Sequence, residues 1–467
     1  KGSWYWSSPA PPADAMPGSA SRAAQVRGRM RRALSTRGTL RGAYALAVSS
    51  QALRQRIADS ETATAAGLAL AALVANGVAV LVTVVFTRLL GDDDYGSLAA
   101  LLSTFTILAV AGSSLQVAVA RDTARGRLGG TTEAVAALRG WTRTLLVVLV
   151  VVGALSVLLR EPIGQLIGVR SDPWGVAAVA PTGVLWLLLS LQRGVLQGIG
   201  AYKPVGLSVV AEALGRLVFG CALVLAGAGV AGAYLGTPLA MAATSVALVE
   251  LLHRRMAAER GEAPHTHRRL RSLVAGGWAP IAGLLLLAAL QNVDVIMAKR
   301  EMPSGQAGSY AAAVVAAKLV VWTAIGIGLH LLPEAARRAG AGEDARPVLG
   351  RALGLLAVVA VPSLAIFALA PETLLRVAFG SEFVTAADSL LVLGCAMTLL
   401  AVSTLSVQYM LALHHTRFLW GLAVVAVAEP LLLSNSDPDM RSFAFVVLGV
   451  QAAAAVWVLG LAVRARA

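Results

Sequence analysis

Five ionisable side chains lie inside stretches that are otherwise apolar. Arg216 is near the middle of one stretch, and Glu212 stands one helical turn before it. Lys318 is about halfway along a second stretch, while Arg193 and Asp294 lie towards the ends of two others. A charge at the centre of a membrane helix costs roughly 2.5 to 3.5 kcal/mol, so such residues usually face a wet cavity or one another. Their chemistry would be the binding of a charged solute or the coupling of its movement to an ion.

Each of these residues also has a purely structural interpretation. Glu212 and Arg216 can neutralise each other at i,i+4 spacing on one helix face. The sequence favours neither this pairing nor direct contact with a substrate over the other. Arg193 can extend to the headgroups, which the sequence favours over a role in a cavity. Lys318 is too central to reach the headgroups, so we expect it to line a cavity.

Asp294 and Asn76 complete the set. Asp294 can cap a helix turn or pair with Lys299 or Arg300, an interpretation that we favour slightly over proton or sodium coupling. Asn76, midway along the first stretch, is expected to bond between helices more than to contact a ligand. As candidates for substrate binding we take Arg216, Lys318, Arg193 and Asn76, and for coupling or gating Asp294 and Glu212. We expect no catalytic residue, cofactor or bound metal.

The elements that position these residues are predicted to be membrane helices. The chain has 467 residues, of which 57% are hydrophobic and 14% charged, and its mean hydropathy is +0.73. This composition is too apolar for an ordinary soluble globule. About twelve stretches are long enough to span a bilayer. They are residues 63–87, 95–119, 141–159, 174–196, 206–227, 230–252, 273–297, 308–332, 350–370, 385–412, 417–433 and 442–463.

Two similar hairpin turns indicate a duplication. Arg88 to Gly96 reads RLLGDDDYG and continues as SLAA, whereas Arg300 to Gly308 reads REMPSGQAG and continues as SYAA. Each turn has an Arg at the end of an apolar helix and a glycine eight residues later. We therefore predict an all-α polytopic membrane protein with about twelve helices in two six-helix lobes related by a parallel repeat.

The predicted domains follow from this duplication. Residues 1–62 form a disordered basic tail, 63–252 the N-terminal lobe, 253–272 a charged cytoplasmic linker, and 273–467 the C-terminal lobe. Cys221 and Cys395 fall within spans, so no extracellular disulfide framework is implied. His265 and His267 in the linker lack further ligands at zinc spacing and are expected to be solvated.

The distribution of basic residues predicts the orientation. About ten Lys and Arg precede residue 63, and about nineteen lie in even-numbered loops and the C-terminus, against about seven in odd-numbered loops. Both termini are thus expected in the cytoplasm, in the plasma (inner) membrane. We expect contacts with anionic lipid headgroups to account for part of the +14 net charge. Nucleic acid is not an expected partner, since no basic motif is interleaved with aromatics.

The largest groups of basic residues lie in two of the loops that are expected on the cytoplasmic side. They are Arg254, Arg255, Arg260, Arg268, Arg269 and Arg271 in the linker, and Arg121, Arg125, Arg127, Arg139 and Arg143 after the second span.

Two segments resemble a known family. Thr87 to Ala99 (TRLLGDDDYGSLA) is similar to the first helix pair of polysaccharide exporters in the multidrug/oligosaccharidyl-lipid/polysaccharide (MOP) superfamily. Asn292, Asp294, Gly308 and Tyr310 resemble that family's NxD and GxYxxA pattern. The resemblance implies a flippase for undecaprenyl-pyrophosphate-linked oligosaccharides, whose relatives include the lipid II flippase and the multidrug antiporters. It also implies lipid-linked glycans as cargo, and glycosyltransferases and a polymerase as partners.

The net positive charge of the ionisable residues within the spans favours an anionic cargo, because Arg and Lys in a wet cleft bind pyrophosphate through charge-assisted hydrogen bonds. We expect two lobes to rock around a central cavity in which Arg216 and Lys318 hold the phosphate. The alternatives are a lipid II flippase, a multidrug antiporter and, less favoured, a membrane glycosyltransferase that would use Asp92, Asp93 and Asp94 as a metal site. For that enzyme the loop is too short, and helix capping explains the acids. No phosphate-binding Walker loop is present, which argues against ATP hydrolysis.

Overall fold

A computed structural model describes residues 19–128, 131–258 and 278–465, with most side chains from Gly67 onward. The chain divides into two compact units, residues 1–66 and residues 67–467. Every regular element in the described part of the chain is helical. The six candidate residues all lie in the second unit.

The first half of the chain supplies six helices and one π-helical turn. Gly91, with a φ of 71°, interrupts the first helix and divides it in two. Gly220 packs on Phe86 while Gly175 packs on Leu101, so the halves of this helix contact different neighbours, α5 and α4. The elements are α1 (Ser19–Ala124), α2 (Thr131–Leu158), α3 (Arg160–Ile167), α4 (Pro173–Gly198), α5 (Tyr202–Leu223), η1 (Val224–Ala228) and α6 (Gly229–Ala258).

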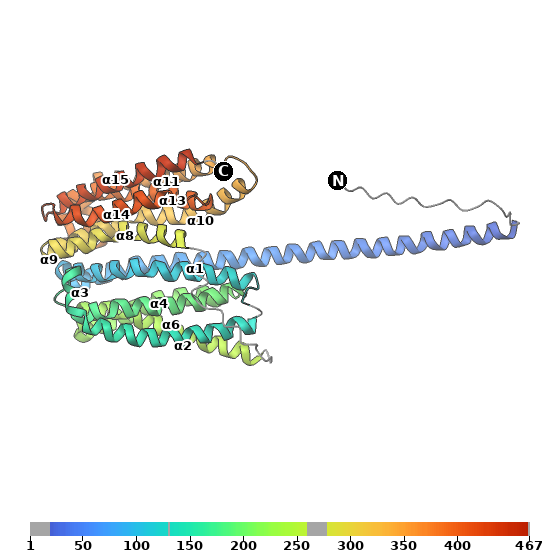
Figure 1. The fold of residues 1–467 in the computed structure, drawn as a ribbon, viewed down its shortest axis with the longest axis horizontal. Helices are drawn as coiled ribbons and strands as arrows, with labels where there is room; N and C mark the ends of the chain where they lie inside the picture. The colour runs from blue at the N-terminus through green and yellow to red at the C-terminus, as the bar shows by residue number, and fades with distance from the viewer. Residues whose placement is uncertain (1–18, 129–130, 259–277, 466–467) are drawn as a thin grey trace, which may run out of the picture. The chain divides into compact units, whose positions relative to one another are not determined.

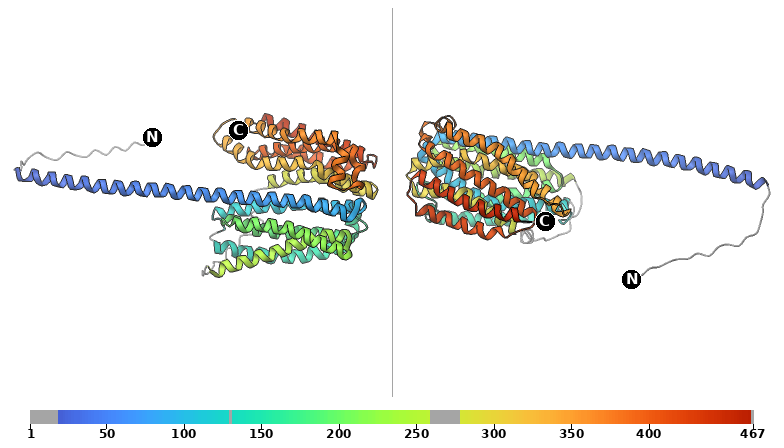
Figure 2. Two further views of the ribbon diagram at one scale, coloured as in Figure 1. Left: turned by 180° about the vertical axis from the view of Figure 1, so that it is seen from behind. Right: turned by 90° about the horizontal axis from the view of Figure 1, so that it is seen from above.

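The second half repeats this plan. An eight-residue helix follows the third span in each half, α3 in the first and α12 in the second. Figures 1 and 2 show the helices from α8 onward gathered as a bundle of their own. The elements are α8 (Trp278–Glu301), α9 (Ser304–Ala317), α10 (Leu319–Gly340), α11 (Arg346–Leu369), α12 (Pro371–Ala378), η2 (Ser381–Ala386), α13 (Ala387–Ala412), α14 (Phe418–Ser434) and α15 (Met440–Arg464).

The number of spans agrees with the twelve predicted. Among the described residues, nine helical segments are long and apolar enough to cross a membrane. Two of these nine contain two spans each, because Gly91 divides Leu70–Ala124 and Gly227 divides Tyr202–Leu252. The shorter apolar helix Phe418–Ser434 adds the last one, so that nine, two and one make twelve. The predicted all-α class with two six-helix lobes is therefore confirmed.

The outer faces of the helices are apolar, as a bilayer requires. Leu369 and Trp420 are more than four-fifths exposed, and Val150 and Leu158 nearly three-quarters. Large apolar side chains exposed in such numbers would be unfavourable in water. The interior uses small residues instead, and α9 buries Ala311, Ala312 and Ala313 completely. The protein is thus a multi-span membrane protein whose helices approach one another closely.

The two similar hairpins pack against each other and join the lobes. A Cβ added at Gly96 would lie 2.9 Å from the backbone nitrogen of Gly308. Tyr95 also reaches the C-terminal lobe outside the second hairpin, where its ring packs edge-to-face on Phe383 of η2 with centroids 5.8 Å apart. Lys299 donates a hydrogen bond to the Asp93 carbonyl oxygen at 3.4 Å. We call this contact, made by residues 88–96 and 299–308, the hairpin seam.

Two predicted segments differ from the structure or fall outside it. Helix α1 begins at Ser19, so it takes in most of residues 1–62, where the sequence predicted a disordered tail. Ala, Arg and Leu are frequent there, and all three are strong helix formers. Most of the predicted linker, including His265 and His267, belongs to residues 259–277, which lie outside the described residues. The domain boundaries themselves stay predictions.

Candidate functional site

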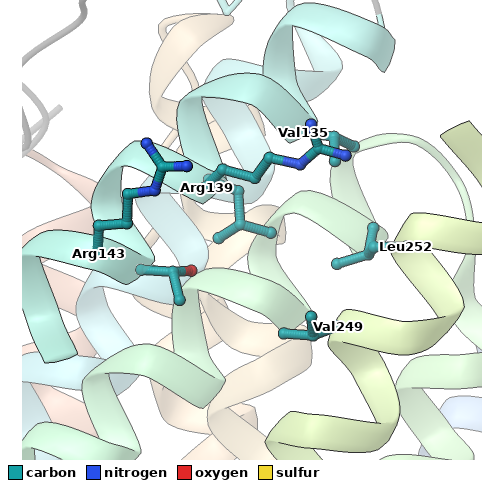
Figure 3. Close-up of a pocket in the computed structure, with 7 residues that line it drawn as sticks. Val135, Arg139, Arg143, Val249 and Leu252 are labelled. Atoms are coloured by element: carbon teal, nitrogen blue, oxygen red, sulfur yellow. The ribbon is translucent and has the colours of Figure 1, made fainter.

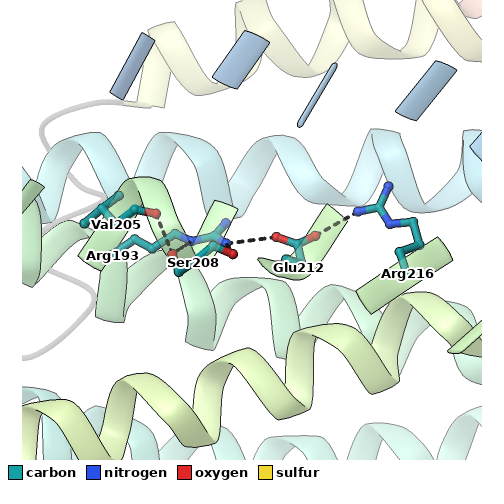
Figure 4. A network of polar contacts seen from close by, with 5 residues as sticks. All are labelled: Arg193, Val205, Ser208, Glu212 and Arg216. Atoms are coloured by element: carbon teal, nitrogen blue, oxygen red, sulfur yellow. Dashed lines mark hydrogen bonds and ion pairs between the residues drawn. The ribbon is translucent and has the colours of Figure 1, made fainter. Parts of the chain in front are cut away.

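The N-terminal lobe contains a buried ionic network, the arginine cluster, formed by Arg193, Ser208, Glu212 and Arg216 (Figure 4). Arg193 on α4 donates from Nη2 to Glu212 Oε2 at 3.0 Å. Arg216 on α5 donates from Nη2 to the other oxygen, Oε1, at 2.8 Å. One carboxylate thus bridges two guanidinium groups from neighbouring helices. The predicted i,i+4 pair of Glu212 and Arg216 is present, but it is half of a larger network.

The position of Arg193 corrects the interpretation that the sequence favoured. Its side chain is only 3% exposed and does not extend to the headgroups. The guanidinium donates to Ser208 Oγ and to the Ser208 carbonyl oxygen, both at 2.9 Å, and it lies over the ring of Trp186. Partners on α5 and the aromatic face keep it inside because they compensate the loss of water.

The arginine cluster has one positive charge in excess, since two guanidinium groups share one carboxylate. The excess is most accessible at Arg216, whose side chain is 26% exposed while those of Arg193 and Glu212 are almost covered. The Nε of Arg216 is buried and has no hydrogen-bond partner among the described residues. A buried donor without a partner is costly, so a rearrangement that brought an acceptor to this atom would be favourable. The geometry therefore suits an anion at the exposed end of the cluster.

The C-terminal lobe contains a second buried group, the carboxyl cluster, formed by Asn292, Asp294, Tyr310, Lys318 and Glu429. Lys318, at the break between α9 and α10, donates to Asn292 Oδ1 at 3.1 Å. The Tyr310 hydroxyl donates to Asp294 Oδ2 at 3.4 Å. Lys318 also interacts electrostatically with Asp294 and with Glu429 of α14.

Asp294 corrects a second expectation. It is fully buried and contacts Tyr310, whereas the sequence favoured a cap or a pair with Lys299 or Arg300. Lys299 belongs instead to the hairpin seam, and Arg300 pairs with Glu301 at 3.2 Å. Asp294 lies on the buried face of α8, whereas Lys299 and Arg300 are in its last turn, at the exposed end of the helix. The two basic side chains therefore do not reach the Asp294 carboxylate.

Glu429 is the residue that sequence reasoning missed. It is completely buried, and both carboxylate oxygens lack a hydrogen-bond partner among the described residues, as does Oδ1 of Asp294. Two carboxyl groups interact electrostatically with one ammonium, so the carboxyl cluster has one negative charge in excess when all three are ionised. The signal was a lone carboxyl in an apolar run before Pro430, near the end of the eleventh predicted span.

Asn76 does not join either cluster. It is exposed on α1 and forms no hydrogen bond with a residue that the structure describes. The interhelical bond expected from the sequence is thus not made in this conformation. The six candidates therefore separate into an arginine cluster in one lobe, a carboxyl cluster in the other, and an isolated amide.

A comparison with known proteins identifies the family of this chain. Residues 63–330, more than half of the chain, match the model of the family described as "Polysaccharide biosynthesis protein". None of the curated proteins gives a significant sequence match.

Solved structures are similar in fold at low identity. An inward-facing MATE family multidrug resistance transporter of the MOP superfamily superposes with a TM-score of 0.66 and 14% identity, covering 82% of this chain and 94% of that one. The lipid II flippase MurJ in an inward closed conformation gives 0.66 and 12%, covering 85% and 87%. The MATE multidrug transporter DinF-BH gives 0.60 and 15%, covering 85% and 94%. Because the family model covers more than half of the chain and the fold is shared with these structures, the chain belongs to the polysaccharide biosynthesis protein family and has the MOP-superfamily fold.

Proposed function

We propose that this protein is a transporter that flips a polyprenyl-pyrophosphate-linked oligosaccharide across the plasma membrane by alternating access. The observation that carries the proposal is the excess positive charge of the arginine cluster at Arg216, whose side chain is 26% exposed while those of Arg193 and Glu212 are almost covered. Pyrophosphate is a concentrated anion, and guanidinium binds it with two parallel hydrogen bonds. A cationic drug would meet repulsion at the same place, which disfavours multidrug antiport.

The roles of the predicted residues divide between the lobes. Arg216 contacts the phosphate, while Arg193 and Glu212 hold Arg216 in position. Lys318 was expected to share phosphate binding, but its ammonium donates to Asn292 and interacts electrostatically with Asp294 and Glu429. We therefore place Lys318 with the coupling residues, and Asn76 stays a candidate for contact with the sugar from the exposed face of α1.

The carboxyl cluster is the proposed coupling site. Its excess negative charge is balanced when one proton or one monovalent cation binds. Both Glu429 oxygens and Oδ1 of Asp294, which have no hydrogen-bond partner among the described residues, can accept it. Binding or release there changes the charge that the lobe must bury, and so biases the equilibrium between two lobe arrangements.

The hairpin seam is the proposed outer gate. Positive-inside topology assigns the seam to the outside and the basic loops to the cytoplasm, with both termini cytoplasmic. Close packing of Gly96 against Gly308 keeps this side shut while the cytoplasmic side admits the cargo. The proposed partners are the lipid-linked anionic glycan, membrane lipids, and the glycosyltransferases and polymerase of the same pathway. No catalytic step by this chain is proposed.

Transport in proteoliposomes tests the proposal. The full-length protein is reconstituted, and translocation is followed as exposure of a fluorescent polyprenyl-pyrophosphate oligosaccharide to a membrane-impermeant reagent. We expect Arg216→Gln to lower the rate at least about tenfold, because a charge-assisted contact is lost, and Arg216→Lys to retain part of it. Arg351→Gln, an exposed arginine on α11, is the matched control and should transport at the normal rate.

The same assay separates the alternative functions. Lipid II in place of the oligosaccharide tests the lipid II flippase, and a cationic dye tests multidrug antiport. Equal rates for Arg216→Gln and the unchanged protein would overturn the role of Arg216. Faster transport of the dye than of either lipid-linked sugar would overturn the proposed cargo.

A further inference from the structure

A pocket of about 410 Å³ lies between α2 and α6 in the N-terminal lobe (Figure 3). None of its lining residues belongs to either buried cluster. The pocket is at the end of the lobe away from the hairpin seam, because α2 begins and α6 ends there. The lining residues are Val135, Leu138, Arg139, Thr142, Arg143, Val249 and Leu252. The pocket thus combines an apolar floor with two basic side chains and no acidic one.

The two arginines line this pocket from the same helix. Arg139 and Arg143 stand at i,i+4 on α2, so their guanidinium groups share one face. Both are exposed, and neither forms an ion pair or hydrogen bond with any residue in the described ranges. Glu250 on the neighbouring helix is already bonded to Arg254 at 2.7 Å. The pair therefore presents two positive charges that the described part of the protein leaves uncompensated.

The surface beyond the arginines, towards the middle of the bilayer, is apolar. Val147 and Val150 continue the same face of α2, and they are 65% and 72% exposed. Val246 lies one turn before Val249 on α6 and is 69% exposed. A molecule with an anionic head and a hydrocarbon chain would match both parts of this surface.

We propose that this pocket binds an anionic phospholipid of the surrounding leaflet, with its phosphate between Arg139 and Arg143 and one acyl chain along Val147 and Val150. Arginines at the membrane boundary attract anionic headgroups, and the planar guanidinium bonds phosphate oxygens in pairs. The pocket opens beside the lipid-facing surface of α2, so a membrane lipid enters it sideways without crossing the protein. The pyrophosphate of the cargo has the same chemistry and is the competing occupant, which the test distinguishes.

Native mass spectrometry of the purified full-length protein tests this proposal. Dioleoylphosphatidylglycerol and dioleoylphosphatidylcholine are titrated separately, and bound lipid is counted. We expect the double variant Arg139→Gln, Arg143→Gln to bind phosphatidylglycerol about 30-fold more weakly, with little change for phosphatidylcholine. Val249→Trp fills the pocket without altering charge and should weaken binding of both lipids. The control Arg351→Gln, Arg417→Gln removes the same charge from exposed positions of the other lobe and should leave phosphatidylglycerol binding at that site unchanged.

Two results would overturn the proposal. One is equal phosphatidylglycerol binding by the Arg139/Arg143 variant and the control. The other is a pair of observations: undecaprenyl pyrophosphate displaces the lipid, and the Arg139/Arg143 variant loses transport in vesicles of phosphatidylcholine alone. Together they would assign the pocket to the cargo. All the substituted arginines are exposed, and an unchanged thermal unfolding midpoint confirms that each variant is folded.

Discussion

Gly96 and Gly308 occupy the same position in two related hairpins, and they meet backbone to backbone between the lobes. A Cβ on Gly96 would approach the Gly308 nitrogen to 2.9 Å, and a Cβ on Gly308 would collide with the Asp92 carbonyl oxygen. The repeated glycine therefore has a reason beyond turn geometry. It allows two copies of one motif to pack against each other at the proposed outer gate.

Gly308→Ala should weaken the hairpin seam. The added methyl group meets backbone atoms that cannot rotate away, and such overpacking costs about 1 to 3 kcal/mol. Thermal unfolding in detergent measures the change. Gly354→Ala on α11, where a Cβ meets nothing within 4 Å, is the control and should be neutral or slightly stabilising. Equal midpoints for the two variants would contradict the close packing at the seam.

Glu212→Gln should destabilise the N-terminal lobe more than Arg216→Gln. Loss of Glu212 leaves Arg193 buried without its carboxylate, and breaking a buried pair costs about 3 to 5 kcal/mol. Loss of Arg216 leaves the bond between Arg193 and Glu212 in place. Denaturation in mixed micelles gives both values, and the reverse order would show that Glu212 does not hold the network together.

Lys318→Met should destabilise the C-terminal lobe, and Glu429→Gln in the same chain should restore part of the loss. Removing the ammonium leaves two buried carboxyl groups that repel each other without a counter-charge, whereas the second change removes one of their charges. A double-mutant cycle on the unfolding free energy measures the interaction. Strictly additive effects would mean that Lys318 and Glu429 do not interact.

Glu429→Gln alone should disconnect transport from the ion gradient. If the carboxyl cluster binds the coupling ion, translocation by the unchanged protein responds to an imposed proton or sodium gradient, and translocation by the variant does not. Proteoliposomes loaded with and without each gradient provide the comparison. Glu372→Gln, an exposed carboxyl on α12, serves as the control. A full gradient response in the Glu429 variant would remove the cluster from the coupling mechanism.

Arg125→Cys and Asp437→Cys should report opposite sides of the membrane. Both positions are exposed, and they lie at opposite ends of the bundle. In intact cells expressing a chain without Cys221 and Cys395, a membrane-impermeant maleimide should label residue 437 and leave residue 125 unlabelled until the cells are opened. The opposite pattern would invert the topology predicted from the basic residues.

Much of the architecture follows from local sequence patterns. The twelve spans come from runs of apolar residues, which the bilayer requires wherever a helix crosses it. The i,i+4 pair of Glu212 and Arg216 lies on one helix, so its geometry follows from helix periodicity alone. The repeated hairpins predicted the two lobes for the same reason, because each turn is a local feature.

The clusters, in contrast, depend on how helices rotate and pack. Arg193 meets Glu212 across α4 and α5, and Glu429 comes to Asp294 and Lys318 from a helix distant in sequence. An ionisable residue in a span has several ways to avoid lipid, and the sequence does not select among them. For this reason Arg193 was expected at the headgroups and Asp294 beside Lys299.

Composition and local patterns were enough to predict the lipid bilayer as the environment, the number of spans, the duplication and the family resemblance. Each of these rests on overall composition or on residues within one helix or turn. Which charges share a site was settled by the packing of helices distant in the chain. That packing put the positive excess of Arg216 in one lobe and the negative excess of Asp294 and Glu429 in the other. The partners of each charge are set by the rotation of its helix about its own axis, and that rotation depends on contacts along the whole interface.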